Sequence, residues 1–140
     1  FDRCGMATLS DDSGLCVDAL NGAPGVYSAR YGGLETDEER NQKLLEEMKD
    51  IPPEKRGAKF VCALCCILSA DTMLECAGEC RGSIGTAPAG DGGFGYDPLF
   101  VVDSRSYSEL TDDEKDRISH RGMALENLCA MLRQVLPGLT

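Results

Sequence analysis

The chain has 140 residues, of which 42% are hydrophobic and 27% charged, a composition typical of one globular domain and too apolar for a disordered chain. No window approaches the run of about 18 apolar residues that a membrane span requires, and no secretory signal is visible. The excess of 24 acidic over 14 basic residues gives a net charge of −10, which argues against a general nucleic-acid binder. We therefore expect a cytoplasmic protein without membrane or nucleic-acid partners.

The cysteines are the most unusual feature of the composition. Cys62 and Cys65 are spaced as in a zinc ribbon, and Cys76 and Cys80 follow. However, residues 60–68 form a continuous apolar run, which predicts a strand buried on both faces. Residues three apart in a strand point to opposite faces and cannot reach one zinc ion. We expect mostly buried, reduced thiols, and we keep a zinc-binding or redox module as the alternative. The eight cysteines are Cys4, Cys16, Cys62, Cys65, Cys66, Cys76, Cys80 and Cys129.

The N-terminal third reads as short extended segments joined by turns. An apolar run at 6–9 predicts a strand that ends in an acidic turn at 10–14. A second extended segment follows at 15–20 and is closed by Asn-Gly at 21–22. Glycines then bracket a loop at 22–33.

The middle of the chain carries the clearest signals for regular structure. Thr36 and Glu39 form a capping box that opens a helix, which stops before Pro52. The apolar strand, over 59–69, leads through a short turn into a partner strand over about 73–84. These two strands predict a long hairpin.

The C-terminal part predicts two more helices. A glycine-rich loop at 85–98 precedes a short strand at 99–102, and Thr111 with Glu114 forms a second capping box. The last helix follows Ser-His-Arg-Gly at 119–122. The whole pattern predicts a single α/β domain over residues 1–140, with a hairpin-bearing sheet.

The first group of residues with chemical potential is acidic. Asp11 and Asp12 follow an apolar strand, and adjacent carboxylates can bind Mg²⁺ and orient a water. Neighbouring like charges also raise a carboxylate pKa, which suits a general base. Taken alone, the pattern is better explained as a solvated turn, because Asp, Ser and Gly are ordinary turn residues.

The second group lies in the glycine-rich loop. Glycines allow the backbone to approach a ligand closely, and Phe94 and Tyr96 offer rings that can stack on a planar base. An equally good reading is a flexible loop whose aromatic residues cover the core. The loop is not a Walker A motif, since no Gly-Lys-Ser/Thr follows.

The third group is Lys115, His120 and Arg121. Six positions and a helix break separate the two cations, so they can converge on one ligand. Their donors suit an acceptor such as a purine 6-keto oxygen and oppose a 6-amino group. Alone the signal is weak, because a lone histidine is more often structural.

Four motifs in order resemble the inosine triphosphate pyrophosphatase (Ham1-like) family. They are Ser10–Leu15, Gly22–Tyr31, Gly92–Phe100 and Ile118–Gly122. The resemblance implies Mg²⁺-dependent hydrolysis of the non-canonical purine nucleotides ITP, dITP and XTP to the monophosphate and pyrophosphate. It further implies an elongated mixed sheet flanked by helices, and a homodimer.

The resemblance also assigns roles to individual residues. Asp12 matches the proton acceptor and metal ligand, and Asp11 is a second acidic group for the metal. Apart from the resemblance, the charge of Arg30 and its position in the loop at 22–33 suggest a phosphate contact. The residues that match substrate contacts are Ser13, Phe94, Gly95, Tyr96, Asp97, Lys115, His120 and Arg121. Among these, Phe94 is the expected stacking ring.

One departure from the family lies before Phe1. The family normally begins several dozen residues earlier, with a Thr/Ser-x-Asn turn, a phosphate-binding lysine and an acidic metal ligand on a helix. We therefore expect an N-terminally truncated member that is weak or inactive by itself. A nucleotide-binding pseudoenzyme is a further alternative.

Overall fold

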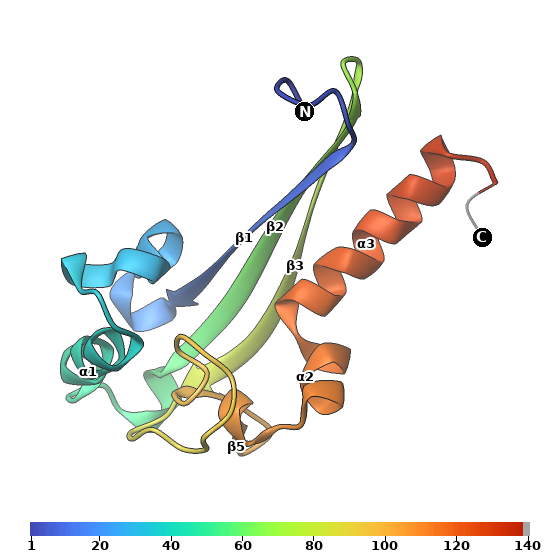
Figure 1. The fold of residues 1–140 in the computed structure, drawn as a ribbon. Helices are drawn as coiled ribbons and strands as arrows, with labels where there is room; N and C mark the ends of the chain where they lie inside the picture. The colour runs from blue at the N-terminus through green and yellow to red at the C-terminus, as the bar shows by residue number, and fades with distance from the viewer. Residues whose placement is uncertain (139–140) are drawn as a thin grey trace.

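The computed structural model describes residues 1–138, which form one five-stranded sheet with helices against it (Figure 1). The strands pair antiparallel in chain order. They are β1 (Thr8–Val17), β2 (Gly57–Ser69), β3 (Thr72–Ile84), β4 (Phe100–Val102) and β5 (Arg105–Ser106). The expected class, an α/β fold with a long hairpin, is confirmed, and every described strand pair is antiparallel.

The hairpin of β2 and β3 is the longest feature of the fold, with 13 residues in each strand. On its other side, β2 pairs with all ten residues of β1, from Thr8 opposite Ile67 to Val17 opposite Ala58. The acidic turn predicted at 10–14 is therefore wrong. Backbone pairing with β2 satisfies the N–H and C=O groups on the β2 side of the strand, and this outweighs the turn preference of Asp, Ser and Gly.

The strand β2 is buried on one face, not on both as its apolar sequence predicts. Cys62, Leu64 and Cys66 are buried and face the last helix, whereas Ala63 is exposed and Cys65 half-buried on the opposite face. Cysteine and alanine are small enough to leave a strand face partly open without a large apolar side chain in water. The separation of Cys62 from Cys65 agrees with the strand geometry that argued against a shared zinc ion.

Helix α3 (His120–Val135) lies along this buried face, over β3 and β2 (Figure 1). The close approach occurs at Gly78, where an added Cβ would lie 2.3 Å from the Ala124 nitrogen and 2.4 Å from the His120 carbonyl oxygen. Leu128, one helical turn after Ala124, packs against the buried side chains of this face. The contact at Gly78 therefore determines where the first turn of α3 sits.

A second core fills the other end of the sheet. The ring centroids of Phe60 and Phe100 are 4.7 Å apart, and Tyr107 lies 4.8 Å from Phe100, in edge-to-face arrangements that aromatic rings favour. Helix α1 (Asp37–Met48) buries Leu44 against this core. The second core thus joins α1 to the base of the hairpin.

The predicted helix starts are confirmed with one shift. Thr36 and Thr111 form the expected capping boxes of α1 and of α2 (Asp112–Ile118). Helix α3 begins at His120, earlier than predicted, because the Ser119 side chain accepts the Gly122 N–H at 3.0 Å and caps the helix. His120 and its neighbour Arg121 consequently lie in the first helical turn. Among residues 1–138, no helix has the length and apolar character needed to cross a membrane.

Arg56 connects the end of α1 and the segment after it to the end of β3. Its buried guanidinium donates to the carbonyl oxygens of Met48, Ile51, Ile84 and Gly85, at 2.6 to 3.1 Å. These carbonyls belong to the end of α1, the segment after it, and the end of β3. The charged hydrogen bonds hold α1 against the sheet.

We predict that Gly78→Ala lowers the free energy of unfolding by about 1–3 kcal/mol, because backbone atoms of α3 occupy the place of the new methyl group. Gly85→Ala is the matched control, since its Cβ would meet neighbours only at 3.4 Å or beyond. Urea unfolding of both variants checks this. Equal stability of the two would show that α3 does not depend on the close approach.

Candidate active site

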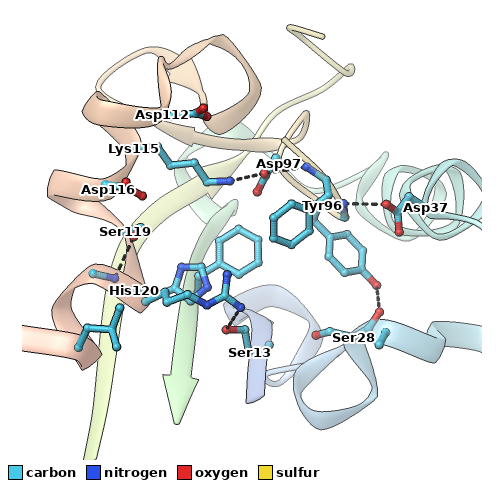
Figure 2. Close-up of a pocket in the computed structure, with 18 of the residues that line it drawn as sticks. Ser13, Ser28, Asp37, Tyr96, Asp97, Asp112, Lys115, Asp116, Ser119 and His120 are labelled. Atoms are coloured by element: carbon cyan, nitrogen blue, oxygen red, sulfur yellow. Dashed lines mark hydrogen bonds and ion pairs between the residues drawn. The ribbon is translucent and has the colours of Figure 1, made fainter. Parts of the chain in front are cut away.

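A pocket of about 770 Å³ lies where α1, the loop at 93–97 and the junction of α2 with α3 meet over the end of β1 (Figure 2). A ligand bound there would contact residues from the N-terminal, middle and C-terminal parts of the chain. All eight residues predicted as substrate contacts line it: Ser13, Phe94, Gly95, Tyr96, Asp97, Lys115, His120 and Arg121.

Asp97 shapes the loop that carries Phe94. It is only 3% exposed, and its Oδ2 accepts the Phe94 N–H at 3.0 Å and pairs with the Lys115 Nζ at 2.5 Å. Gly93 has a φ of +73°, and an added Cβ would lie 2.1 Å from the same oxygen, so only glycine fits there. Phe94 is left 65% exposed at the pocket, with the Lys115 ammonium 4.9 Å from its ring centre.

Tyr96 has a structural place in the same loop. Its hydroxyl donates to the Ser28 carbonyl oxygen at 2.7 Å (Figure 2), and burial raises its pKa to about 12. The phenol therefore anchors the loop to the segment after β1. Of the two loop aromatics, Phe94 is the one with a free ring face.

His120 lies at the back of the pocket, 7% exposed, and stacks on Phe60 with centroids 4.7 Å apart and planes 15° apart. Burial lowers its pKa to about 4, and the positive charges of Arg121 and Lys115 add to this effect. The ring is thus neutral at pH 7. Among the described residues its buried Nδ1 has no hydrogen-bond partner.

Arg121 projects from the first turn of α3 towards β1. Its Nε donates to Asp11 Oδ2 at 2.7 Å, and its terminal nitrogen donates to Ser13 Oγ at 3.4 Å. The ion pair is partly exposed, so a ligand anion can compete for the guanidinium. Lys115 and Arg121 therefore place two cations around one pocket, as the sequence predicts.

The two adjacent carboxylates of β1 diverge. Alternation along the strand puts Asp11 with Ser13 on the α3 side, and Asp12 on the opposite face, beside Ala63 and Ala77 of the neighbouring strands. Neither aspartate lines the pocket. Their roles as metal ligands, and that of Asp12 as proton acceptor, stay predictions.

Arg30 lies outside the pocket lining, with its guanidinium 5.2 Å from the centre of the Tyr27 ring. Its phosphate contact also stays a prediction. All eight cysteines are free thiols. Within residues 1–138, no three or more His, Cys, Asp or Glu side chains are grouped as a metal site would require.

The contribution of α1 to the pocket is not predicted from the sequence. Asp37 and Arg40 line the pocket next to the loop, and Asp37 Oδ2 accepts the Gly95 N–H at 2.8 Å. In the sequence, Asp37 reads only as an acidic residue in the first turn of a helix, where it suits the helix dipole. No local signal indicates a contact with a residue 58 positions away.

Comparisons with known proteins agree on one family. The family model described as "Ham1 family" matches residues 1–131. A dITP/XTP pyrophosphatase of Frankia alni is 49% identical, with 96% of this chain and 71% of the relative covered. One from Shigella flexneri is 52% identical, covering 92% of this chain and 68% of the relative.

Two solved structures match the fold as well. The Staphylococcus aureus Ham1 protein has a TM-score of 0.88 at 37% identity, over 95% of this chain and 70% of its own. A HAM1 protein from Coxiella burnetii has a TM-score of 0.86 at 44% identity, over 94% of this chain and 70% of its own. At 37% and 44% identity, these two proteins resemble the chain in sequence as well as in fold.

The depressed pKa of His120 gives a pH-dependence of stability. Between pH 6.5, its ordinary pKa, and about 4, its pKa in the fold, the unfolded chain binds a proton that the folded chain does not. We predict that this contribution to stability is complete above pH 6.5 and falls with pH, by at most about 1.4 kcal/mol per pH unit. Urea unfolding from pH 4 to 7 compares the wild type with His120→Gln, which lacks the titration. Parallel curves for the two proteins would contradict the prediction.

Proposed function

The chain belongs to the Ham1 family, and on that premise we propose that it is a dITP/XTP pyrophosphatase. It hydrolyses ITP, dITP and XTP to the nucleoside monophosphate and pyrophosphate, and so removes deaminated purines from the nucleotide pool. The observation that carries the proposal is the pocket itself. There an exposed aromatic ring, Phe94, lies beside one cation, Lys115, and a second cation, Arg121, lines the same pocket.

The pocket lining accounts for a preference for keto purines. A purine ring stacks on Phe94, while Lys115 and Arg121 offer only donors, which suit the 6-keto oxygen of hypoxanthine or xanthine. The 6-amino group of adenine would direct hydrogens at these donors and leave them unpaired. His120, which is neutral at pH 7, adds a polar side chain to the pocket lining without a further positive charge.

The residues present fit a Mg²⁺ ion that is shared with the substrate. Mg²⁺ is usually held by one or two carboxylates together with substrate phosphates and water. Asp12 is exposed, and no described side chain pairs with it, so its carboxylate is available as a ligand. Asp11 is paired with Arg121 and would have to give up that partner in order to bind the ion as well. When bound, the ion neutralises phosphate charge and favours pyrophosphate as the leaving group.

The position of β1 allows one nucleotide to use both faces of the sheet. β1 is the outer strand of the described sheet, and the segment at 23–28 covers its outer edge at Leu15 and Val17. The pocket face and the Asp12 face therefore meet at the part of that edge beside Asp12 and Ser13. A triphosphate that leaves the pocket passes Ser13 and reaches Asp12 across that edge. Asp12 then takes the proton of the water that attacks the α-phosphorus, in line with the departing pyrophosphate.

The homodimer that the family resemblance implies is part of the same proposal. It predicts that the chain elutes at twice its mass of 15.0 kDa in gel filtration with light scattering.

Product analysis tests the reaction and its specificity. With Mg²⁺ present, we expect a form extended at the N-terminus to the length of its relatives to release pyrophosphate, and not phosphate, from dITP, ITP and XTP, with ATP at least about 100-fold slower in kcat/KM. The 140-residue chain assayed beside it should be slower, and the extended form serves as the wild type in the kinetic experiments below. Release of phosphate would contradict attack at the α-phosphorus. Equal rates with ATP would contradict the recognition of the 6-keto oxygen.

We further predict that Asp12→Asn lowers kcat by at least about 100-fold, because the general base is lost, while inosine monophosphate binds within about threefold of the wild type. Glu75→Gln is the matched control, since Glu75 is an exposed carboxylate that lies two strands from Asp12 on the same face of the sheet. Pyrophosphate release and calorimetry measure the two quantities. Full turnover by the Asp12 variant would exclude it as the base.

A further inference from the structure

Helix α1 holds one residue of the base-binding loop by both of its backbone polar groups. Asp37 Oδ2 accepts the Gly95 N–H at 2.8 Å (Figure 2), and the Asn41 side-chain amide donates to the Gly95 carbonyl oxygen at 3.0 Å. Asp37 and Asn41 are four positions apart, so they lie on the same face of the helix one turn apart. We call this pair of contacts the α1 clamp.

The clamp acts at the point where the loop is otherwise least constrained. Gly95 has a φ of +59°, outside helix and strand, and it lies between Phe94 and Tyr96. Phe94 is held through its N–H by Asp97, and Tyr96 through its hydroxyl by Ser28. The peptide that joins these two anchored residues is positioned by α1.

The electrostatics of Asp37 favour a strong contact. Arg40 pairs with its Oδ1 at 2.6 Å, and the hydrogen bonds from Arg40 and from the Gly95 N–H lower the pKa of Asp37. The carboxylate is therefore ionised at neutral pH, and a hydrogen bond to an ionised acceptor is stronger than a neutral one. Arg40 is held in turn by the Leu34 carbonyl oxygen at 2.7 Å.

Asn41 carries a cost that a purely structural residue would avoid. It is 8% exposed, and within the described residues its buried Oδ1 has no hydrogen-bond partner. A buried, unsatisfied acceptor destabilises the fold, and an apolar side chain at this position of α1 would remove that cost. The compensating contact of Asn41 is the one to Gly95.

We propose that Asp37 and Asn41 are positioning residues for base recognition. They hold Gly95, and thereby keep the ring of the neighbouring Phe94 in the orientation in which a purine stacks on it. This inference rests on the proposed function, because it assigns the loop to the base of the nucleotide. It predicts that loss of the clamp weakens binding of the base without weakening binding of the phosphates.

Kinetics of matched variants test the clamp. Asp37→Ala removes the acceptor and should raise KM for dITP by about 5- to 30-fold with kcat within about threefold, since stacking acts equally in the ground and transition states. Asp37→Asn keeps an acceptor oxygen and should restore most of the affinity. Glu38→Ala is the control, because Glu38 is an exposed acid of the same helical turn without a described partner, and its KM should not change.

Two further readouts separate positioning from general destabilisation. The inhibition constant of inorganic triphosphate should be the same in wild type, Asp37→Ala and Asn41→Leu, whereas inosine monophosphate should bind both variants more weakly. The amide proton of Gly95 should exchange with solvent faster in Asp37→Ala than in Glu38→Ala, as measured by NMR. An equal loss of affinity for triphosphate and for the monophosphate would overturn the proposal in favour of a merely structural role.

The failure of this inference is distinguishable from failure of the proposed function. If the wild type releases no pyrophosphate from dITP, the proposed function fails, while exchange at Gly95 and binding of inosine monophosphate still test the clamp. If the wild type turns over dITP and Asp37→Ala changes neither KM nor the exchange of Gly95, the clamp is refuted and the proposed function stands.

Discussion

The buried ion pair between Asp97 and Lys115 is the contact on which the pocket depends. Moving a carboxylate out of water is expensive, and the cost is offset only if the charge is paired and hydrogen-bonded. Asp97 meets both conditions, by accepting the Phe94 N–H and by pairing with Lys115 of α2. The fold of the loop and the position of α2 therefore depend on each other. The same pair also presents an aromatic ring and an ammonium group, side by side, to a ligand.

The remaining walls of the pocket are set by contacts of other kinds. Close packing on Gly78 determines how near α3 lies to the sheet. The helix begins after its cap, Ser119, and its first turn therefore places His120 and Arg121 in the pocket lining, close to β1. On the opposite wall, Asp37 joins α1 to the loop. An acidic chain with a net charge of −10 can thus bind a nucleotide, because its pocket cations are held in place by carboxylates that partly balance them.

The divergence of Asp11 and Asp12 connects the sheet to the proposed chemistry. Adjacent residues of a strand face opposite ways, so one carboxylate orients an arginine at the pocket and the other stands on the far face. An acidic turn, as the sequence suggests, would have allowed both to approach one ion. In the proposed function, the extended strand therefore separates base recognition on one face from phosphate chemistry on the other, and the two meet at the edge of β1 beside Asp12 and Ser13.

The sequence by itself determined the features that depend on neighbouring residues: the capping boxes at Thr36 and Thr111, the long hairpin, and the four motifs that carry the family resemblance. Through those motifs it also identified eight of the residues that line the pocket, but not Asp37 and Arg40 of α1. Tertiary structure alone decided that β1 continues through its acidic residues, that β2 buries one face, and that Asp37 holds Gly95. Strand pairing, helix packing and hydrogen bonds between distant segments decide these features. Such contacts leave no periodic or local pattern in the chain, since each depends on a partner that only folding brings near.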